Sequence, residues 1–150
     1  MPMHTSPYSS GTPLRWAYNM PYNDYWRQFK VWQTGAPATA IWFQLCLKAG
    51  DGYLASRIAA VAIARLAARE TGAPVYVSAI NGFSEGTCSL VGPDGVNRSA
   101  RLRDELVAHG IALRGPDMPS LSYAELEADR CHPNAAGQAR IGEALLGFFG

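Results

Sequence analysis

The stretch TAIWFQLCL, residues Thr39–Leu47, is an almost unbroken run of apolar side chains, rich in β-branched and aromatic types. Such a run is typical of a strand that is buried on both faces of a parallel sheet. A second run, PVYVSAI at Pro74–Ile80, has the same character. The segment between them, Tyr53–Glu70, predicts a helix. Four of its apolar residues fall at helical spacing: Leu54, Ile58, Val61 and Leu66. Strand, helix and strand in this order predict a βαβ unit with a right-handed crossover.

The residues around this unit predict where its helix begins and ends and how the chain continues. Asp51 is the expected N-cap of the helix, and Gly72 is its expected C-terminal stop. A loop rich in glycine and proline follows the second strand. Beyond it, Ser99 is the expected N-cap of a helix that runs to His109, and Ile111–Leu113 is a short third strand.

The C-terminal part of the chain predicts two more helices. Ser122 and Glu125 have the spacing of a capping box for a short helix that ends near Ala128. Asn134 is the expected N-cap of the last helix. One face of that helix is lined by Ile141, Leu145 and Phe148. The alternation of strands and helices predicts an α/β fold with a parallel sheet, in which the chemistry lies beyond the carboxyl ends of the strands.

The N-terminal residues do not extend this alternation. Residues 1–21 are rich in Pro, Ser, Tyr and Asn and predict an irregular arm. Asn23 is the expected cap of a short helix, Asp24–Thr34, which stops at Gly35. Its face carries Tyr22, Trp26 and Phe29. The 150 residues are expected to form one domain.

Composition excludes several classes of function. The chain has 13 Lys and Arg against 12 Asp and Glu, so it lacks the basic surplus of a nucleic-acid-binding protein. No apolar run approaches the roughly 20 residues that cross a bilayer. The segment Met1–Gly11 does not have the pattern of a secretory signal. The chain is therefore expected to be cytoplasmic by default, or secreted if its N-terminus is truncated and Cys88 is bridged to Cys131.

The segment that points to chemistry runs from Asp129 through Arg, Cys, His132, Pro133 and Asn134 to Gly137. In a D-x-x-H turn, the carboxylate can accept a hydrogen bond from the imidazole Nδ1, which fixes the tautomer and leaves Nε2 to act as a base. Proline stiffens the backbone after the histidine, and the asparagine cap anchors the turn to a helix. Each part alone is an ordinary surface residue, but together they hold one imidazole in place.

The segment DRCHPNAAGQARIGEALL resembles the C-terminal motif block of the SGNH (GDSL-type) hydrolases. The resemblance covers roughly Ala38 to Gly150. It implies a flavodoxin-like three-layer α/β/α sandwich, here apparently shortened at the N-terminus. It also implies that Asp129 and His132 are the acid and base of a Ser-His-Asp triad that hydrolyses esters without a cofactor.

Two departures from the family pattern concern the oxyanion donors and the nucleophile. Where the family has the Asn of a G-x-N-D block, this chain has Lys48 by position, which can still donate to an oxyanion. Gly35 matches the second oxyanion donor only by elimination. No G-D-S sequence occurs, and Ser10, which precedes Gly11, is the best of the early serines as a nucleophile.

Other interpretations of the chemistry stay open. Cys46 is expected at the same sheet edge as His132, so a Cys–His pair is conceivable, although a strand cysteine is usually a small buried apolar residue. A bridge between Cys88 and Cys131 would brace the turn that carries His132. The histidines, with Asp129 and Cys131, match no zinc spacing, so no metal site is expected.

The sequence therefore supports two hypotheses. The first is a hydrolase of a small, neutral or weakly charged ester. The second is a catalytically inactive SGNH-like domain or fragment that binds a partner or associates with itself. In that case the edge of the strand Thr39–Leu47 would be exposed and would pair with a second copy or with a strand of a partner.

Overall fold

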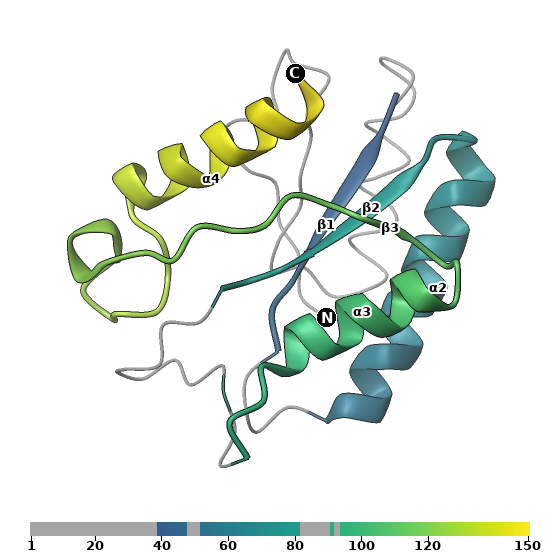
Figure 1. The fold of residues 1–150 in the computed structure, drawn as a ribbon, viewed down its shortest axis with the longest axis horizontal. Helices are drawn as coiled ribbons and strands as arrows, with labels where there is room; N and C mark the ends of the chain where they lie inside the picture. Colours follow the sequence, from purple (N-terminus) through teal and green to yellow (C-terminus); the bar gives the residue numbers. More distant parts are fainter. Residues whose placement is uncertain (1–38, 48–51, 82–90, 92–93) are drawn as a thin grey trace.

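The computed structural model describes residues 39–47, 52–81, 91 and 94–150. The elements along the chain are β1 (Ile41–Leu45), α2 (Tyr53–Thr71), β2 (Val75–Ala79), α3 (Arg98–Ala108), β3 (Leu113–Arg114), the 3-10 helix η2 (Tyr123–Glu125) and α4 (Ala135–Phe149). Figure 1 shows their arrangement. The expected arm 1–21 and helix 24–34, together with Asp51 and Cys88, lie outside the described residues.

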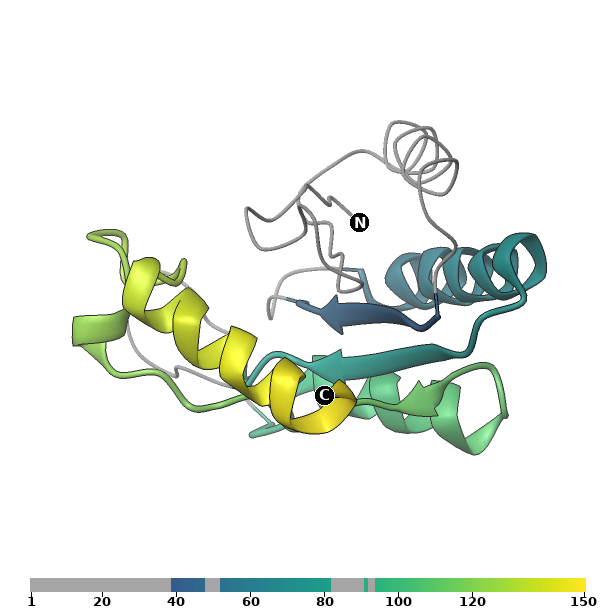
Figure 2. The same cartoon turned by 90° about the horizontal axis from the view of Figure 1, so that it is seen from above.

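The three strands form one parallel sheet in the order β1-β2-β3. Helices α2 and α3 pack on one face and α4 on the other, which Figures 1 and 2 show from two directions. The α/β sandwich predicted from the sequence is confirmed. Within the described residues β1 is the outer strand on its side, and its pairing with a second copy stays a prediction. No helix among these residues has both the length and the apolar character needed to cross a membrane.

Side chains of the strands alternate between two apolar clusters. One cluster, the α2–α3 core, takes Phe43 and Val77 from the strands and Ile63 and Leu102 from the helices. The other, the α4 core, includes Trp42, Ile80, Met118, Leu121, Leu126, Cys131, Ile141 and Leu145. The alternation follows from the two-residue period of a strand. Burial on both faces explains why the strand sequences are continuously apolar.

The apolar residues that mark α2 in the sequence do not all lie on its buried face. Leu54 and Ile58 are 67% and 62% exposed. The buried residues of the helix are Ala60, Ile63, Ala64 and Ala67. Their spacing of three and four residues makes one face, on which three of the four side chains are alanine. The helix begins after Gly52 as N-cap, not Asp51, and it ends at Gly72 as predicted, with a φ of 69°.

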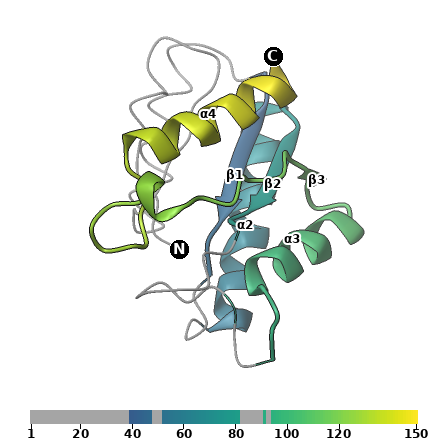
Figure 3. The same cartoon turned by 60° about the vertical axis from the view of Figure 1, so that its left-hand side comes forward.

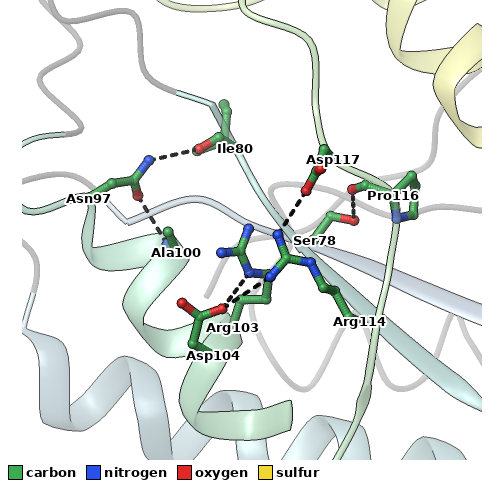
Figure 4. Close-up of polar contacts among 9 residues, drawn as sticks. All are labelled: Ser78, Ile80, Asn97, Ala100, Arg103, Asp104, Arg114, Pro116 and Asp117. Atoms are coloured by element: carbon green, nitrogen blue, oxygen red, sulfur yellow. Dashed lines mark hydrogen bonds and ion pairs between the residues drawn. The ribbon is translucent and has the colours of Figure 1, made fainter. Parts of the chain in front are cut away.

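The predicted cap of α3 is also wrong. Asn97 is the N-cap: its Oδ1 accepts from Ala100 N at 3.1 Å, and its Nδ2 donates to the carbonyl of Ile80 at 3.1 Å (Figure 4). The predicted cap, Ser99, is fully buried, and its hydroxyl accepts the N–H of Leu47 at 2.7 Å. Both side chains fasten α3 to the carboxyl end of a strand, so the helix start is set by contacts with the sheet.

The third strand begins two residues later than predicted and ends one residue later, at Leu113–Arg114. The N–H groups of Ile111 and Ala112 instead donate to the carbonyl of Leu106, at 2.9 and 3.3 Å. They thus close the C-terminal end of α3. The first residues predicted for the strand are therefore used to end the helix.

The segment after β3 is fastened to the face of the sheet that carries α4. Ser78 Oγ accepts from Trp42 Nε1 at 2.9 Å and donates to the carbonyl of Pro116 at 2.5 Å (Figure 4 shows the second bond). A Cβ on Gly115 would lie 2.6 Å from the same oxygen, so only glycine fits there. Asn81 Nδ2 donates to the carbonyl of Met118 at 3.2 Å. The carboxyl end of β2 thereby holds the chain that leads to η2.

Helix α4 follows the prediction at its start and departs from it at its end. Asn134 is its N-cap, and Ile141 and Leu145 are buried. Phe148 is 46% exposed. Phe149 is partly buried against the α4 core instead. The short helix before it is only the 3-10 turn η2, with the predicted Ser122–Glu125 capping box at its start.

Candidate active site

The loop between η2 and α4, which Figure 3 shows beside the first turn of α4, is closed by backbone hydrogen bonds. Leu126 and Pro133 form an antiparallel bridge. The N–H of Glu127 donates to the carbonyl of His132 at 2.7 Å, and the N–H of Arg130 donates to the carbonyl of Glu127 at 2.9 Å. These bonds define the histidine turn, residues 126–134, as a unit with a fixed backbone.

Asp129 divides its two carboxylate oxygens between the backbone and the imidazole. Oδ1 accepts the N–H of Cys131 at 2.9 Å and the N–H of His132 at 3.1 Å. Oδ2 lies 2.5 Å from His132 Nδ1. The predicted contact between the two side chains is therefore present, and the backbone bonds keep the carboxylate from rotating away from the ring.

These contacts set the protonation of the pair. The hydrogen bond from His132, followed by the two backbone N–H donors, lowers the pKa of Asp129 from 3.8 to about 2. The carboxylate is therefore ionised at neutral pH, and a carboxylate beside Nδ1 favours the tautomer that carries its proton on that nitrogen. The side chains of His132 and Asp129 are 43% and 45% exposed, so the pair lies at the surface.

Asn134 joins the histidine turn to both neighbouring helices. Its Oδ1 accepts the N–H of Gly137 at 3.1 Å, which caps α4 as predicted. Its Nδ2 donates to the carbonyl oxygens of Ala124 at 2.8 Å and Leu126 at 3.1 Å. One amide side chain therefore fixes η2, the turn and α4 relative to one another.

Gly137 is the last residue of the segment that begins at Asp129, and the structure shows why this position is a glycine. A Cβ at this position would collide with the backbone carbonyl oxygen of Glu125, and it would lie 3.1 Å from Leu121 Cδ1 and from Pro133 Cβ. The first turn of α4 thus packs directly on the backbone of η2. This requirement could not be derived from spacing alone, since it depends on the approach of two separate segments.

Arg140 is a supporting residue whose role the sequence does not reveal. Its NH1 group donates to both carboxylate oxygens of Glu125, at 3.0 and 3.1 Å, and to the carbonyl of Ser120 at 3.2 Å. Glu125 also accepts the backbone N–H of Ser122, which is the main cause of its lowered pKa. A capping-box pattern reveals Ser122 and Glu125 but carries no signal for an arginine 15 residues further on.

The structure describes two of the three cysteines and only some of the other predicted site residues. Cys131 is disulfide-bonded and buried in the α4 core, whereas Cys46 is exposed. The expected partner, Cys88, lies outside the described residues, as do Ser10, Gly35 and Lys48. The Cys46–His132 pair stays a prediction. Among the described residues no group of His, Cys, Asp and Glu could hold a metal ion.

Comparison with models of protein families, with curated proteins and with solved structures found no match for this chain. Function is therefore inferred from the geometry of the histidine turn and from the residues that build it.

The lowered pKa of Asp129 predicts how stability depends on pH. A carboxylate whose pKa is lower in the folded than in the unfolded protein stabilises the fold fully at pH values above its unfolded-state pKa. That contribution is lost as the pH falls toward the folded-state pKa. For Asp129 this interval runs from 3.8 down to about 2. We expect Asp129→Asn to lose less Tm than the wild type between about pH 5 and pH 2, measured by circular dichroism. Equal losses in the two proteins would contradict the assignment.

The disulfide at Cys131 predicts a response to reductant. A native disulfide typically contributes about 2–4 kcal/mol to the free energy of unfolding. We expect dithiothreitol to lower the Tm of the wild type but to have no further effect on Cys131→Ala. Cys46→Ala is the matched control and should keep the wild-type response, because Cys46 is an exposed thiol. A wild-type Tm that does not change with reductant would count against a stabilising role.

Proposed function

We propose that this protein is an ester hydrolase of the SGNH type, with His132 as general base and Asp129 as the residue that orients it. One observation carries the proposal. The carboxylate of Asp129 binds the Nδ1 side of the His132 ring at 2.5 Å while backbone N–H groups hold its other oxygen. An imidazole fixed in this way is the base arrangement of nucleophilic acyl transfer.

The proposed reaction is ester hydrolysis with Nε2 of His132 as the base. Nε2 of His132 takes the proton of a nucleophilic hydroxyl as its oxygen attacks the ester carbonyl, and the carbonyl oxygen becomes an oxyanion. The tetrahedral intermediate collapses, and the imidazolium gives its proton to the leaving alcohol. Water then repeats the same steps on the acyl-enzyme. Ser10 is the candidate nucleophile because Gly11 follows it, with a serine outside the given sequence as the alternative. Lys48 is the candidate oxyanion donor by its position in the family pattern, and Gly35 is a second candidate by elimination.

The proposal is tested by labelling the nucleophile. The intact chain is treated with a fluorophosphonate probe, digested and analysed by mass spectrometry to locate the modified residue. We expect one labelled serine, slower labelling in His132→Ala, and loss of hydrolysis of a para-nitrophenyl ester in the labelled protein. His109→Ala, which changes an exposed histidine at the end of α3, should label like the wild type.

The opposite result also has a defined meaning. If no serine is labelled, and if hydrolysis is the same in His132→Ala as in the wild type, the chain is not a serine hydrolase. The histidine turn would then be architecture in a non-catalytic domain, which is the alternative that the sequence leaves open.

A further inference from the structure

Arg130 has a backbone conformation that its residue type disfavours. Its φ is 56°, and it is the one non-glycine residue with positive φ among those the structure describes. A non-glycine residue in the left-handed region costs of order 1–3 kcal/mol when it is held there, and glycine would relieve that cost. Arginine therefore occupies a position in the histidine turn where glycine would be the less strained choice.

The guanidinium of Arg130 is held in place by an aromatic ring. Its central carbon lies 4.8 Å from the centre of the Tyr123 ring, and Tyr123 is itself 47% exposed. A cation over an aromatic ring is attracted by the electrons of the ring face, which leaves the N–H donors of the guanidinium available to an anion. Both residues of the pair are exposed, so the cation held by the ring lies at the surface.

Arg130 differs from Arg140 in its ion pairs. Arg140 is paired with Glu125 at 3.0 Å. Among the described residues, the ion pairs formed by arginine do not include Arg130. The nearest carboxylate along the chain, Asp129, is committed to His132 and to two backbone N–H groups.

We propose that Arg130, stacked on Tyr123, binds a carboxylate group carried by the substrate, so that the preferred substrates are esters with a free carboxylate. The proposal deepens the proposed function, and it rests on it. Arg130 is two residues before His132, so the cation and the base belong to the same turn, whose backbone is closed by hydrogen bonds. The guanidinium fork matches a carboxylate in a bidentate pair, which is stronger than a hydrogen bond between neutral groups.

The test compares two esters that differ in one charge: para-acetoxybenzoate, which carries a carboxylate, and its uncharged methyl ester. Arg130→Ala should raise KM for the charged ester by about tenfold and leave KM for the methyl ester within about twofold of the wild type. Arg130→Lys should recover part of the difference, because lysine keeps the charge and loses the fork. Arg69→Ala, at an exposed site in the last turn of α2, is the matched control and should change neither value.

A binding measurement separates this proposal from the proposed function. Benzoate and its neutral analogue benzamide are titrated into ¹⁵N-labelled protein, and the signals of Arg130 and His132 are followed by NMR. We expect saturable shifts with benzoate, none with benzamide, and loss of the benzoate shifts in Arg130→Ala. Benzoate binding without ester turnover would keep the carboxylate site and overturn the hydrolase. Turnover of both esters with no benzoate shifts would overturn the site and keep the hydrolase.

Discussion

Replacing His132 by Ala should lower kcat/KM for ester hydrolysis by about 10³-fold, because the reaction then lacks the base that activates the nucleophile. Asp129→Asn should lower it by a similar factor. The amide would offer an N–H or a weaker acceptor to Nδ1, so the imidazole would no longer be held in the tautomer that leaves Nε2 basic. Initial rates with a para-nitrophenyl ester across pH measure both effects.

Two matched variants separate catalysis from surface chemistry. His109→Ala removes an exposed histidine at the end of α3. Asp117→Asn removes a carboxylate outside the histidine turn, which forms an ion pair with Arg114 at 3.0 Å. Both should keep wild-type kcat/KM. If His132→Ala and Asp129→Asn keep wild-type rates while their Tm is unchanged, the pair is not a catalytic one.

Replacing Gly137 by Ala should destabilise the protein by about 2–3 kcal/mol, since the added methyl group collides with the backbone oxygen of Glu125. A backbone atom cannot swing aside as a long side chain can. Relief requires η2 and the first turn of α4 to separate, which strains the Asn134 bonds to Ala124 and Leu126. Urea denaturation followed by circular dichroism gives the free energy of unfolding.

The same helix provides a control with the opposite sign. A Cβ at Gly142 would meet no atom within 4 Å. Gly142→Ala should therefore stabilise the protein by about 0.5–1 kcal/mol, because alanine has the higher helix propensity. If both variants shift stability in the same direction, the close approach at Gly137 is not what requires glycine there.

The sequence predicts the fold well where a single local pattern decides an element. The strands at Ile41–Leu45 and Val75–Ala79 lie within the predicted apolar runs, and Asn134 caps α4 as expected. Prediction fails where tertiary contacts choose between local options. Ser99 has the chemistry of a cap, but its hydroxyl binds the N–H of Leu47, and Asn97 begins α3 in its place.

The sequence does not reveal the buried face of α2, for a related reason. The pattern gives most weight to the large residues Leu54 and Ile58, whereas the helix packs through a row of alanines that carry a weaker apolar signal. The distance between a helix and a sheet is a property of both surfaces, so the helix sequence alone does not decide which side is buried.

In the candidate site, too, the local contacts could be predicted from the sequence and the tertiary contacts could not. The contact between Asp129 and His132 could be predicted because it is made within four residues of a turn. The roles of Gly137, Arg140 and Tyr123 depend on how η2 meets α4, which no spacing rule contains. The residues expected to act as nucleophile and oxyanion donors are tied to the turn only by the family resemblance.

The bonds that hold His132 have one more property in common, which is that their partners are near one another in the sequence. The side chain of Asn134 reaches back at most 10 residues, and the Arg140 bond to Ser120 spans 20. The sheet contact of Ser99, by comparison, spans 52. Contacts of low sequence separation close with little loss of chain entropy and form early in folding. We expect the amides of the histidine turn to exchange with solvent as one cooperative unit, at a rate that differs from that of the strand amides.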